Sequence, residues 1–202
     1  MEMPDTRSLL ERARGGEAEA FCELCLSYEA RLLRQAIALC GNASFAEDLA
    51  QDTLVEAWTS LNRFSGRCEF FTWLCAILFN RHRNALRQRW TIRLSTLTEE
   101  NRDEIRDSVG QLADHYPPPD QAAERCDQAA LVHKCIRALP PKHQEVIYLR
   151  FYVDDSLEGI AAALHCSLGT VKSRLFHALE KLRGMNALSE HLTGVETNLK
   201  LL

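Results

Sequence analysis

The stretch from residue 154 to residue 183 constrains the fold most, because its apolar residues recur at helical spacing in two short runs. The first run is broken at residues 165–167, where Ser167 suits the N-cap of a following helix. The pattern therefore predicts two short helices joined by a tight turn. Their apolar faces comprise Leu157, Ile160, Ala161 and Leu164, and then Val171, Leu175, Ala178, Leu179 and Leu182.

The second of these helices has a polar face opposite its apolar one. That face carries hydrogen-bonding and cationic side chains at Thr170, Ser173, Arg174, His177 and Lys181. A helix-turn-helix needs one helix to brace and one to lie in the DNA major groove, so the pattern favours a DNA-binding unit. An ordinary helical corner with a solvated polar face is the alternative, and this stretch alone leaves both open.

Length and composition limit the possible classes of protein. The 202 residues allow one large or two small domains, and 46% hydrophobic with 26% charged residues is typical of a globular chain. No run approaches the roughly 20 apolar residues of a membrane span. The N-terminal residues include acids and lack an apolar core, so no signal peptide is expected. We expect an intracellular protein.

Charge is distributed unevenly along the chain, although its net value is only −4. Residues 70–98 contain five arginines and no acid. A helix is predicted there, buried through Phe71, Trp73, Leu74, Ile77 and Leu78, and its polar stripe comprises Asn80, Arg83, Asn84 and Arg87. Amides and guanidinium groups together suit base edges and phosphates, which favours nucleic acid. The alternative is a basic surface helix paired to acids elsewhere in the chain.

The predicted helix at residues 46–61 has the opposite character. Its polar face contains acids and no cation, whereas a merely solvated face usually mixes both signs. This favours a basic or hydrogen-bonding protein partner. Its buried face is predicted to include Ala46, Leu49, Ala50, Ala57, Trp58 and Leu61.

Residues 95–127 are polar and acidic and contain three consecutive prolines at 117–119, which is typical of a linker. A second helical unit begins near residue 121, and Pro140-Pro141 separates two of its helices. In the later one, Val146, Ile147, Leu149 and Phe151 are predicted to pack inside. No strand pattern is present. The predicted fold is all-α, with two small helical domains joined by an acidic flexible linker, the second domain containing the helix-turn-helix.

Four blocks, spanning about 160 residues in order, carry a resemblance to a known family. They read AFCELCLSYEARL, AEDLAQDTLVEAW, FFTWLCAILFNRHRN and LPPKHQEVIYLRFYVDDSLEGIAAALHCSLGTVKSRLFHALEKLR. The chain resembles bacterial RNA polymerase sigma factors of the extracytoplasmic-function (ECF) group. The resemblance implies an N-terminal domain at 1–94, an acidic linker at 95–120, a C-terminal domain at 121–184 and a tail at 185–202. Gly159 departs from the family pattern, where glutamate is usual, and should cost its helix up to about 1 kcal/mol.

The resemblance also implies a function and its sites. The expected protein is a non-enzymatic subunit that binds core RNA polymerase and directs transcription from promoter DNA, without a cofactor or metal. Core polymerase would be bound by Glu47, Asp48, Gln51, Asp52 and Glu56. The minus-ten promoter element would be opened and bound by Arg63, Ser65, Arg67, Asn80, Arg81, Arg83, Asn84 and Arg87, with residues 62–69 as a base-capture loop. The minus-thirty-five element would be bound by Thr170, Lys172, Ser173, Arg174 and His177.

The resemblance further implies control by an anti-sigma factor. The expected location is the cytoplasm, or the inner membrane when a membrane-bound inhibitor holds the protein there, without direct membrane insertion. Two rival functions remain at this stage. One is a stand-alone helix-turn-helix repressor that binds DNA tightly without polymerase. The other is a metal or thiol sensor using residues such as Cys22, Cys25, Cys68 and Cys166, although core packing is favoured for the first pair.

Overall fold

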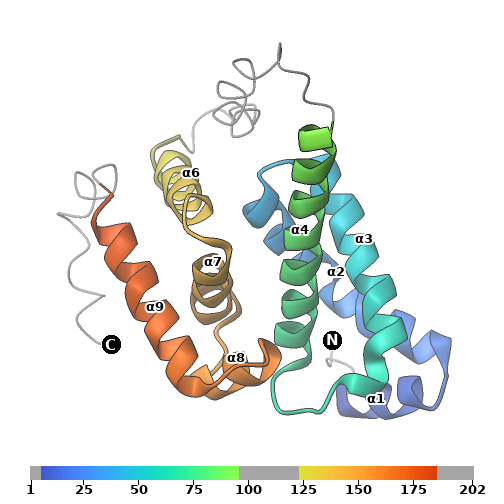
Figure 1. Ribbon diagram of the computed structural model, residues 1–202. Coiled ribbons are helices and arrows are strands. Elements are labelled where there is room, and N and C mark those ends of the chain that lie inside the picture. Colours follow the sequence, from blue (N-terminus) through green and yellow to red (C-terminus); the bar gives the residue numbers. More distant parts are fainter. Residues whose placement is uncertain (1–5, 96–122, 186–202) are drawn as a thin grey trace.

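The computed structural model describes residues 6–95 and 123–185, with only the backbone described for 89–95 and 123–129. Helices α1–α4 form one group and helices α6–α9 a second, and the two groups lie side by side (Figure 1). Helix α4 contacts α7, η3 and α8, so it lies between the two groups. The described residues contain no strand, which confirms the all-α prediction.

The first domain contains α1 (Thr6–Arg14), α2 (Ala18–Cys40), α3 (Ala43–Ser60), the short 3-10 helix η1 (Leu61–Arg63) and α4 (Phe70–Ser95). The junction between α2 and α3 follows from two adjacent residues. Gly41 adopts a left-handed conformation, with φ of 69°, and its N–H donates to Ile37 O at 2.8 Å. Asn42 then caps α3 by accepting from Phe45 N at 2.9 Å. Gly41 therefore ends α2 and Asn42 begins α3 at adjacent positions.

An aromatic cluster fastens the loop at residues 62–69 to the start of α4. Phe64 is buried, and its ring centroid lies 5.3 Å from that of Trp73 and 5.6 Å from that of Phe70. The Arg14 guanidinium donates to Phe64 O and lies over the same ring. Ser65 and Arg67 are exposed beyond this anchor. The loop is therefore held at one residue and exposed at its tip.

The second domain contains α6 (Ala123–Arg137), α7 (Pro141–Tyr148), the π-turn η3 (Leu149–Val153), α8 (Leu157–Ala163) and α9 (Leu168–Arg183). Serine side chains begin both helices of the helix-turn-helix. Ser156 Oγ accepts from Gly159 N at 3.0 Å, and Ser167 Oγ accepts from Thr170 N at 3.1 Å. Val171 and Ala178 of α9 are fully buried. The predicted helix-turn-helix and its Ser167 cap are confirmed.

Two predicted core residues are in fact exposed. Trp58 is 37% exposed, although its indole packs against Phe21 at a centroid distance of 5.0 Å. Phe151 is 45% exposed, because η3 takes it out of the 3.6-residue period on which the prediction depended. Tyr148 is buried instead, and its hydroxyl donates to Ala38 O of the first domain at 2.9 Å.

The predicted linker at 95–120 and tail at 185–202 lie outside the described residues, apart from Ser95 and Met185. Within residues 6–95 and 123–185, no helix combines the length and the hydrophobicity needed to cross a lipid bilayer.

Candidate nucleic-acid interface

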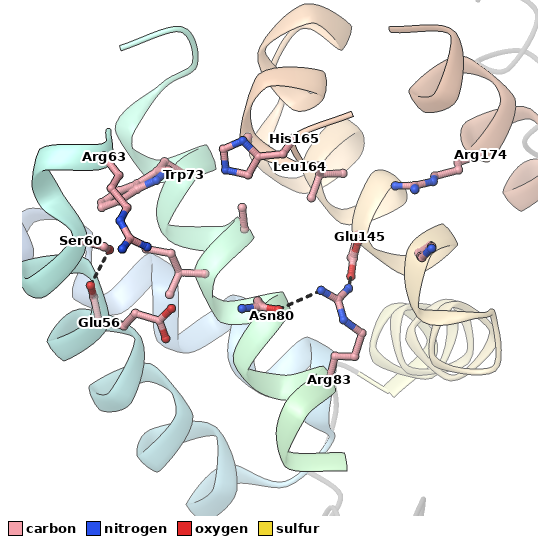
Figure 2. A pocket seen from close by; sticks show the side chains of 14 residues that line it. Glu56, Ser60, Arg63, Trp73, Asn80, Arg83, Glu145, Leu164, His165 and Arg174 are labelled. Atoms are coloured by element: carbon pink, nitrogen blue, oxygen red, sulfur yellow. Dashed lines mark hydrogen bonds and ion pairs between the residues drawn. The ribbon is translucent and has the colours of Figure 1, made fainter. Parts of the chain in front are cut away.

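The polar stripe predicted on α4 faces the second domain. Asn80 and Arg83 point into a cavity of about 580 Å³ between the domains, together with His165 and Arg174 from the helix-turn-helix (Figure 2). We refer to it as the interdomain cavity. Further lining residues include Glu56, Ser60, Arg63, Trp73, Lys142, Glu145 and Leu164. Asn84 and Arg87, the other two residues of the stripe, are exposed.

Arg83 is engaged by an acid of the second domain. Its guanidinium donates to the Glu145 carboxylate of α7 and also to Asn80 Oδ1, the latter at 3.0 Å. Glu145 is only 5% exposed, so burial raises its pKa, while the nearby charge of Arg83 opposes that rise. Phosphate could reach Arg83 only after this ion pair has separated.

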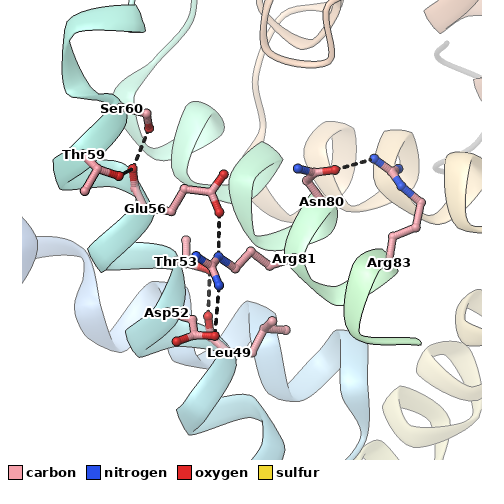
Figure 3. Close-up of polar contacts among 9 residues, drawn as sticks. All are labelled: Leu49, Asp52, Thr53, Glu56, Thr59, Ser60, Asn80, Arg81 and Arg83. Atoms are coloured by element: carbon pink, nitrogen blue, oxygen red, sulfur yellow. Dashed lines mark hydrogen bonds and ion pairs between the residues drawn. The ribbon is translucent and has the colours of Figure 1, made fainter. Parts of the chain in front are cut away.

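Arg81 has the opposite orientation and contacts α3. Its Nε donates to Glu56 Oε2 at 2.6 Å and its Nη1 to Asp52 Oδ2 at 3.1 Å (Figure 3). Arg81, which was predicted to bind DNA, is therefore ion-paired with Asp52 and Glu56, which were predicted to bind polymerase. The acidic face of α3, which contains no cation of its own, receives one from α4. Glu47, Asp48 and Gln51 remain exposed.

The tip of the loop before α4 presents its predicted DNA contacts to solvent. Arg63, Ser65 and Arg67 are exposed, and Gly66 provides the turn with φ of 72°. Arg63 also lines the interdomain cavity beside Trp73 and Ser60 (Figure 2). The loop thus places two arginines and a hydroxyl group beside the N-terminal end of α4.

The cysteine chemistry considered from the sequence finds little support here. Burial, followed by the charges of Asp155 and Glu69, raises the pKa of Cys68 to about 11. Burial likewise raises the pKa of Cys25 to about 12. Both thiols are therefore protonated at neutral pH and poorly nucleophilic. Among the described residues, no group of three or more His, Cys, Asp or Glu could hold a metal ion.

Helix α9 exposes most of its predicted DNA contacts. Lys172, Ser173 and His177 are exposed, whereas Thr170 is half-buried at the helix start and Arg174 is half-buried beside the interdomain cavity. Sequence reasoning missed Phe176, which is 58% exposed next to His177. The signal was present, because residue 176 lies outside the apolar stripe of the helix.

Sequence reasoning also missed an apolar hollow lined by residues of α2 and α3, which we call the apolar patch. Its volume is about 370 Å³, and its lining residues are Ala18, Phe21, Cys22, Cys25, Leu54, Val55 and Trp58. Val55 is 63% exposed, and the nearby α2 residue Leu26 is 72% exposed. Large exposed apolar side chains beside an acidic face are typical of a protein-binding surface.

Comparison with known proteins identifies the family. The Sigma-70 region 2 model matches residues 24–92, and the Sigma-70 region 4 model matches residues 135–184. The RNA polymerase sigma-H factor of Pseudomonas aeruginosa is 31% identical over 176 residues, which cover 87% of this chain and 91% of that protein. The chain belongs to the sigma-70 family.

Other similar proteins place this sigma factor in the ECF group. The ECF sigma factor SigW of Bacillus subtilis is 25% identical over 174 residues, covering 86% of this chain and 92% of that protein. The ECF sigma-E factor of Escherichia coli (strain K12) is 29% identical over 175 residues, covering 86% and 90%.

Two solved structures are also similar. The sigma factor RpoE from Bartonella quintana, co-crystallised with the anti-sigma factor NepR, has a TM-score of 0.58 and 28% identity over 81% of this chain and 94% of that one. CnrH, in complex with the cytosolic domain of CnrY, has a TM-score of 0.58 and 24% identity over 93% of this chain and 99% of that one, and shows the fold alone.

The matched regions coincide with the two helical groups. Region 2 covers most of α2 and continues through α3 into α4, and region 4 extends from the end of α6 through α9. This sigma factor is therefore a non-enzymatic subunit that directs RNA polymerase to promoters. Membership of this family argues against the stand-alone repressor that was considered from the sequence.

Proposed function

We propose that this sigma factor binds its partners through three separate surfaces. These surfaces lie on two domains, at 1–94 and 121–184, which are joined by the acidic linker at 95–120. One surface binds core polymerase, a second opens the minus-ten element, and the third reads the minus-thirty-five element. The exposure of most residues in the three sets carries the proposal, because each surface presents side chains suited to its partner. Tethered modest contacts add up to tight binding, so neither domain needs high affinity alone.

The polymerase surface comprises the acidic face of α3 and the apolar patch beside it. Glu47, Asp48 and Gln51 supply exposed polar groups, and Val55 and Trp58 supply apolar area. Protein interfaces commonly combine an apolar centre with a polar rim, and tryptophan is enriched among their most important residues. Asp52 and Glu56 contribute through Arg81, which holds them in place.

The minus-ten surface comprises the exposed loop tip and the stripe on α4. Arg63, Ser65 and Arg67 contact an unpaired base and its phosphates. Asn80, Arg83, Asn84 and Arg87 continue along the strand, with guanidinium groups for phosphate and amides for base edges.

The minus-thirty-five surface is the exposed side of α9. Lys172 and His177 contact phosphates or base edges, Ser173 donates a hydrogen bond, and Thr170 and Arg174 flank them. Phe176 adds an apolar contact suited to the methyl group of thymine.

An anti-sigma factor controls access to these surfaces. The similar RpoE from Bartonella quintana was crystallised with the anti-sigma factor NepR, which supports an inhibitor of the same kind here. If that inhibitor is anchored in the inner membrane, it holds this cytoplasmic sigma factor there until release.

Reconstitution with core polymerase tests the three surfaces separately. Val55→Asp should reduce the affinity for core polymerase at least tenfold while leaving DNA contacts intact. Phe176→Ala should leave that affinity unchanged but lower transcription about fivefold from promoters with a minus-thirty-five element, since about 1 kcal/mol of apolar contact is lost. Glu29→Gln, a substitution at an exposed position of α2, serves as the control. Wild-type polymerase binding by Val55→Asp would refute the docking surface.

A further inference from the structure

Asp155, in the turn before α8, has a carboxylate that joins the two domains. Thr72 Oγ1 of α4 donates to Asp155 Oδ2 at 2.5 Å, and Glu69 N–H, just before α4, donates to the same oxygen at 3.4 Å. Ser156 N–H donates to Oδ1 at 2.6 Å. Asp155 is 8% exposed and Thr72 is fully buried. The second domain thus supplies an acceptor for the first turn of α4, which favours negative charge.

Gly159 makes room for this carboxylate. A Cβ atom at residue 159 would lie 2.3 Å from Asp155 Oδ1, closer than any ordinary contact. Glycine is a poor helix former, so its presence inside the seven-residue helix α8 needs a reason. The space taken by Asp155 supplies that reason. The glutamate that the family usually has at this position would not fit.

Other contacts join the domains in the same arrangement. Arg83 of α4 pairs with Glu145 of α7, and the Tyr148 hydroxyl donates to Ala38 O of α2. The Tyr148 ring also stacks on Phe79 of α4, with centroids 6.1 Å apart. Together these contacts bring Asn80 and Arg83 of the first domain and Arg174 of the second to one cavity of about 580 Å³.

This closed arrangement cannot serve a promoter. The minus-ten and minus-thirty-five elements of a promoter are about 25 base pairs apart. At about 3.4 Å per base pair, this separation is roughly 80 Å of duplex. Arg83 of the minus-ten set and Arg174 of the minus-thirty-five set line a single cavity, so the two sets cannot reach both elements at once. The domains must separate before transcription starts, and the Asp155–Thr72 contact must break.

We propose that the Asp155–Thr72 contact, made possible by Gly159, holds the free sigma factor closed and inhibits its own binding to promoter DNA. The inhibitory part rests on the proposed function of α4 and α9. The closed state itself is a property of the free chain and can be measured without polymerase or DNA.

The decisive variant is Gly159→Ala in the full-length protein. The added Cβ displaces the Asp155 carboxylate, although alanine is the better helix former. Thr72→Val removes the donor from the other domain, so the two variants test one contact from both sides. Asp154→Asn is the matched control, because Asp154 has an exposed side chain and a left-handed backbone that asparagine tolerates.

Two measurements on the free protein test closure. Small-angle X-ray scattering should give a larger radius of gyration for Gly159→Ala and Thr72→Val than for the wild type and Asp154→Asn. Hydrogen exchange in the first turn of α4 should become at least tenfold faster in the same two variants. Circular dichroism checks that both variants keep their helices. Unchanged scattering and exchange in both folded variants would overturn the closed state, whatever the DNA-binding assays give.

Inhibition is tested by titrating a labelled DNA duplex that carries both promoter elements with each free protein. The two opened variants should bind at least threefold more tightly than the wild type and the control. If they open without gaining affinity, the contact joins the domains but does not inhibit, and that half of the proposal is wrong. If Val55→Asp binds polymerase normally, the docking surface is refuted instead, and the scattering result stands independently.

Discussion

Helices α4 and α9 both present polar, cationic faces, yet their cations have different surroundings. Arg81 and Arg83 on α4 are paired with acids that lie 25 to 62 residues away in the sequence, on α3 and α7. Lys172 and Lys181 on α9 take part in no ion pair within residues 6–95 and 123–185. A basic segment in a sequence therefore does not reveal which of its charges are available, because the acid partner can come from another domain.

Replacing Arg83 should show the largest difference between the two helices. Arg83→Met leaves the buried Glu145 carboxylate without its partner, which should cost about 2 kcal/mol, below the usual range for a buried pair because Arg83 is partly exposed. Lys172→Met on α9 should change the free energy of unfolding by less than about 0.5 kcal/mol. Urea denaturation at pH 7 measures both, and equal losses would contradict the comparison.

The Arg83 variant should also depend on pH. Burial raises the pKa of Glu145 in the folded state, and loss of Arg83 removes the charge that opposes this rise. The folded state then holds a proton that the unfolded state has released, so stability falls as pH rises from about 4.5 through the folded pKa. The deficit of Arg83→Met should therefore shrink as the pH is lowered from 7 to 5. A constant deficit would rule out this cause.

Neutralising Glu145 should make α4 resemble α9. Glu145→Gln removes a buried charge and releases Arg83, which is exposed enough to be solvated, so the free energy of unfolding should change by about 1 kcal/mol or less. In the free protein, where the two domains are still in contact, the variant should bind promoter DNA more tightly than the wild type. The slope of log affinity against log salt should steepen by about one unit, because one more phosphate contact forms. Lys142→Gln, which removes a charge beside the same cavity, is a control expected to weaken binding.

The titration of His143 on α7 should have the smallest effect on the free energy of unfolding, a few tenths of a kcal/mol. The pKa of His143 also depends on the charges of α9. Burial lowers the pKa of His143, and Lys181, His177 and Arg174 of α9 lower it further. Because the folded state then prefers the neutral ring, stability is lost as pH falls below the usual value of about 6.5. Lys181→Gln should raise the pKa of His143, measured by NMR titration of the ring. An unchanged pKa would show that the charge of α9 is screened at this distance.

The sequence predicted what depends on neighbouring residues. The Ser167 cap was located correctly because a serine cap acts within a few residues of itself. The buried stripe of α4, including Leu74 and Leu78, followed from helical periodicity. The family's site residues could be named from motifs, but their roles remain predictions.

What the sequence could not predict depends on contacts between distant segments. Trp58 was predicted to be buried in α3, yet 37% of it remains exposed even though its ring packs against Phe21 of α2. The π-turn at 149–153 removed Phe151 from the helical period. From the sequence alone, Gly159 was expected only to reduce the stability of its helix. The structure shows that the missing side chain makes room for the Asp155 carboxylate.

Since both halves of the Asp155–Thr72 contact belong to one chain, each domain meets the other at a local concentration on the order of millimolar. A contact too weak to hold two separate domains together can therefore keep most molecules closed. If about nine molecules in ten are closed, a partner that needs the open form binds about tenfold more weakly than its intrinsic affinity. A single methyl group at residue 159 would then change how much of the cellular pool is open and able to bind promoter DNA.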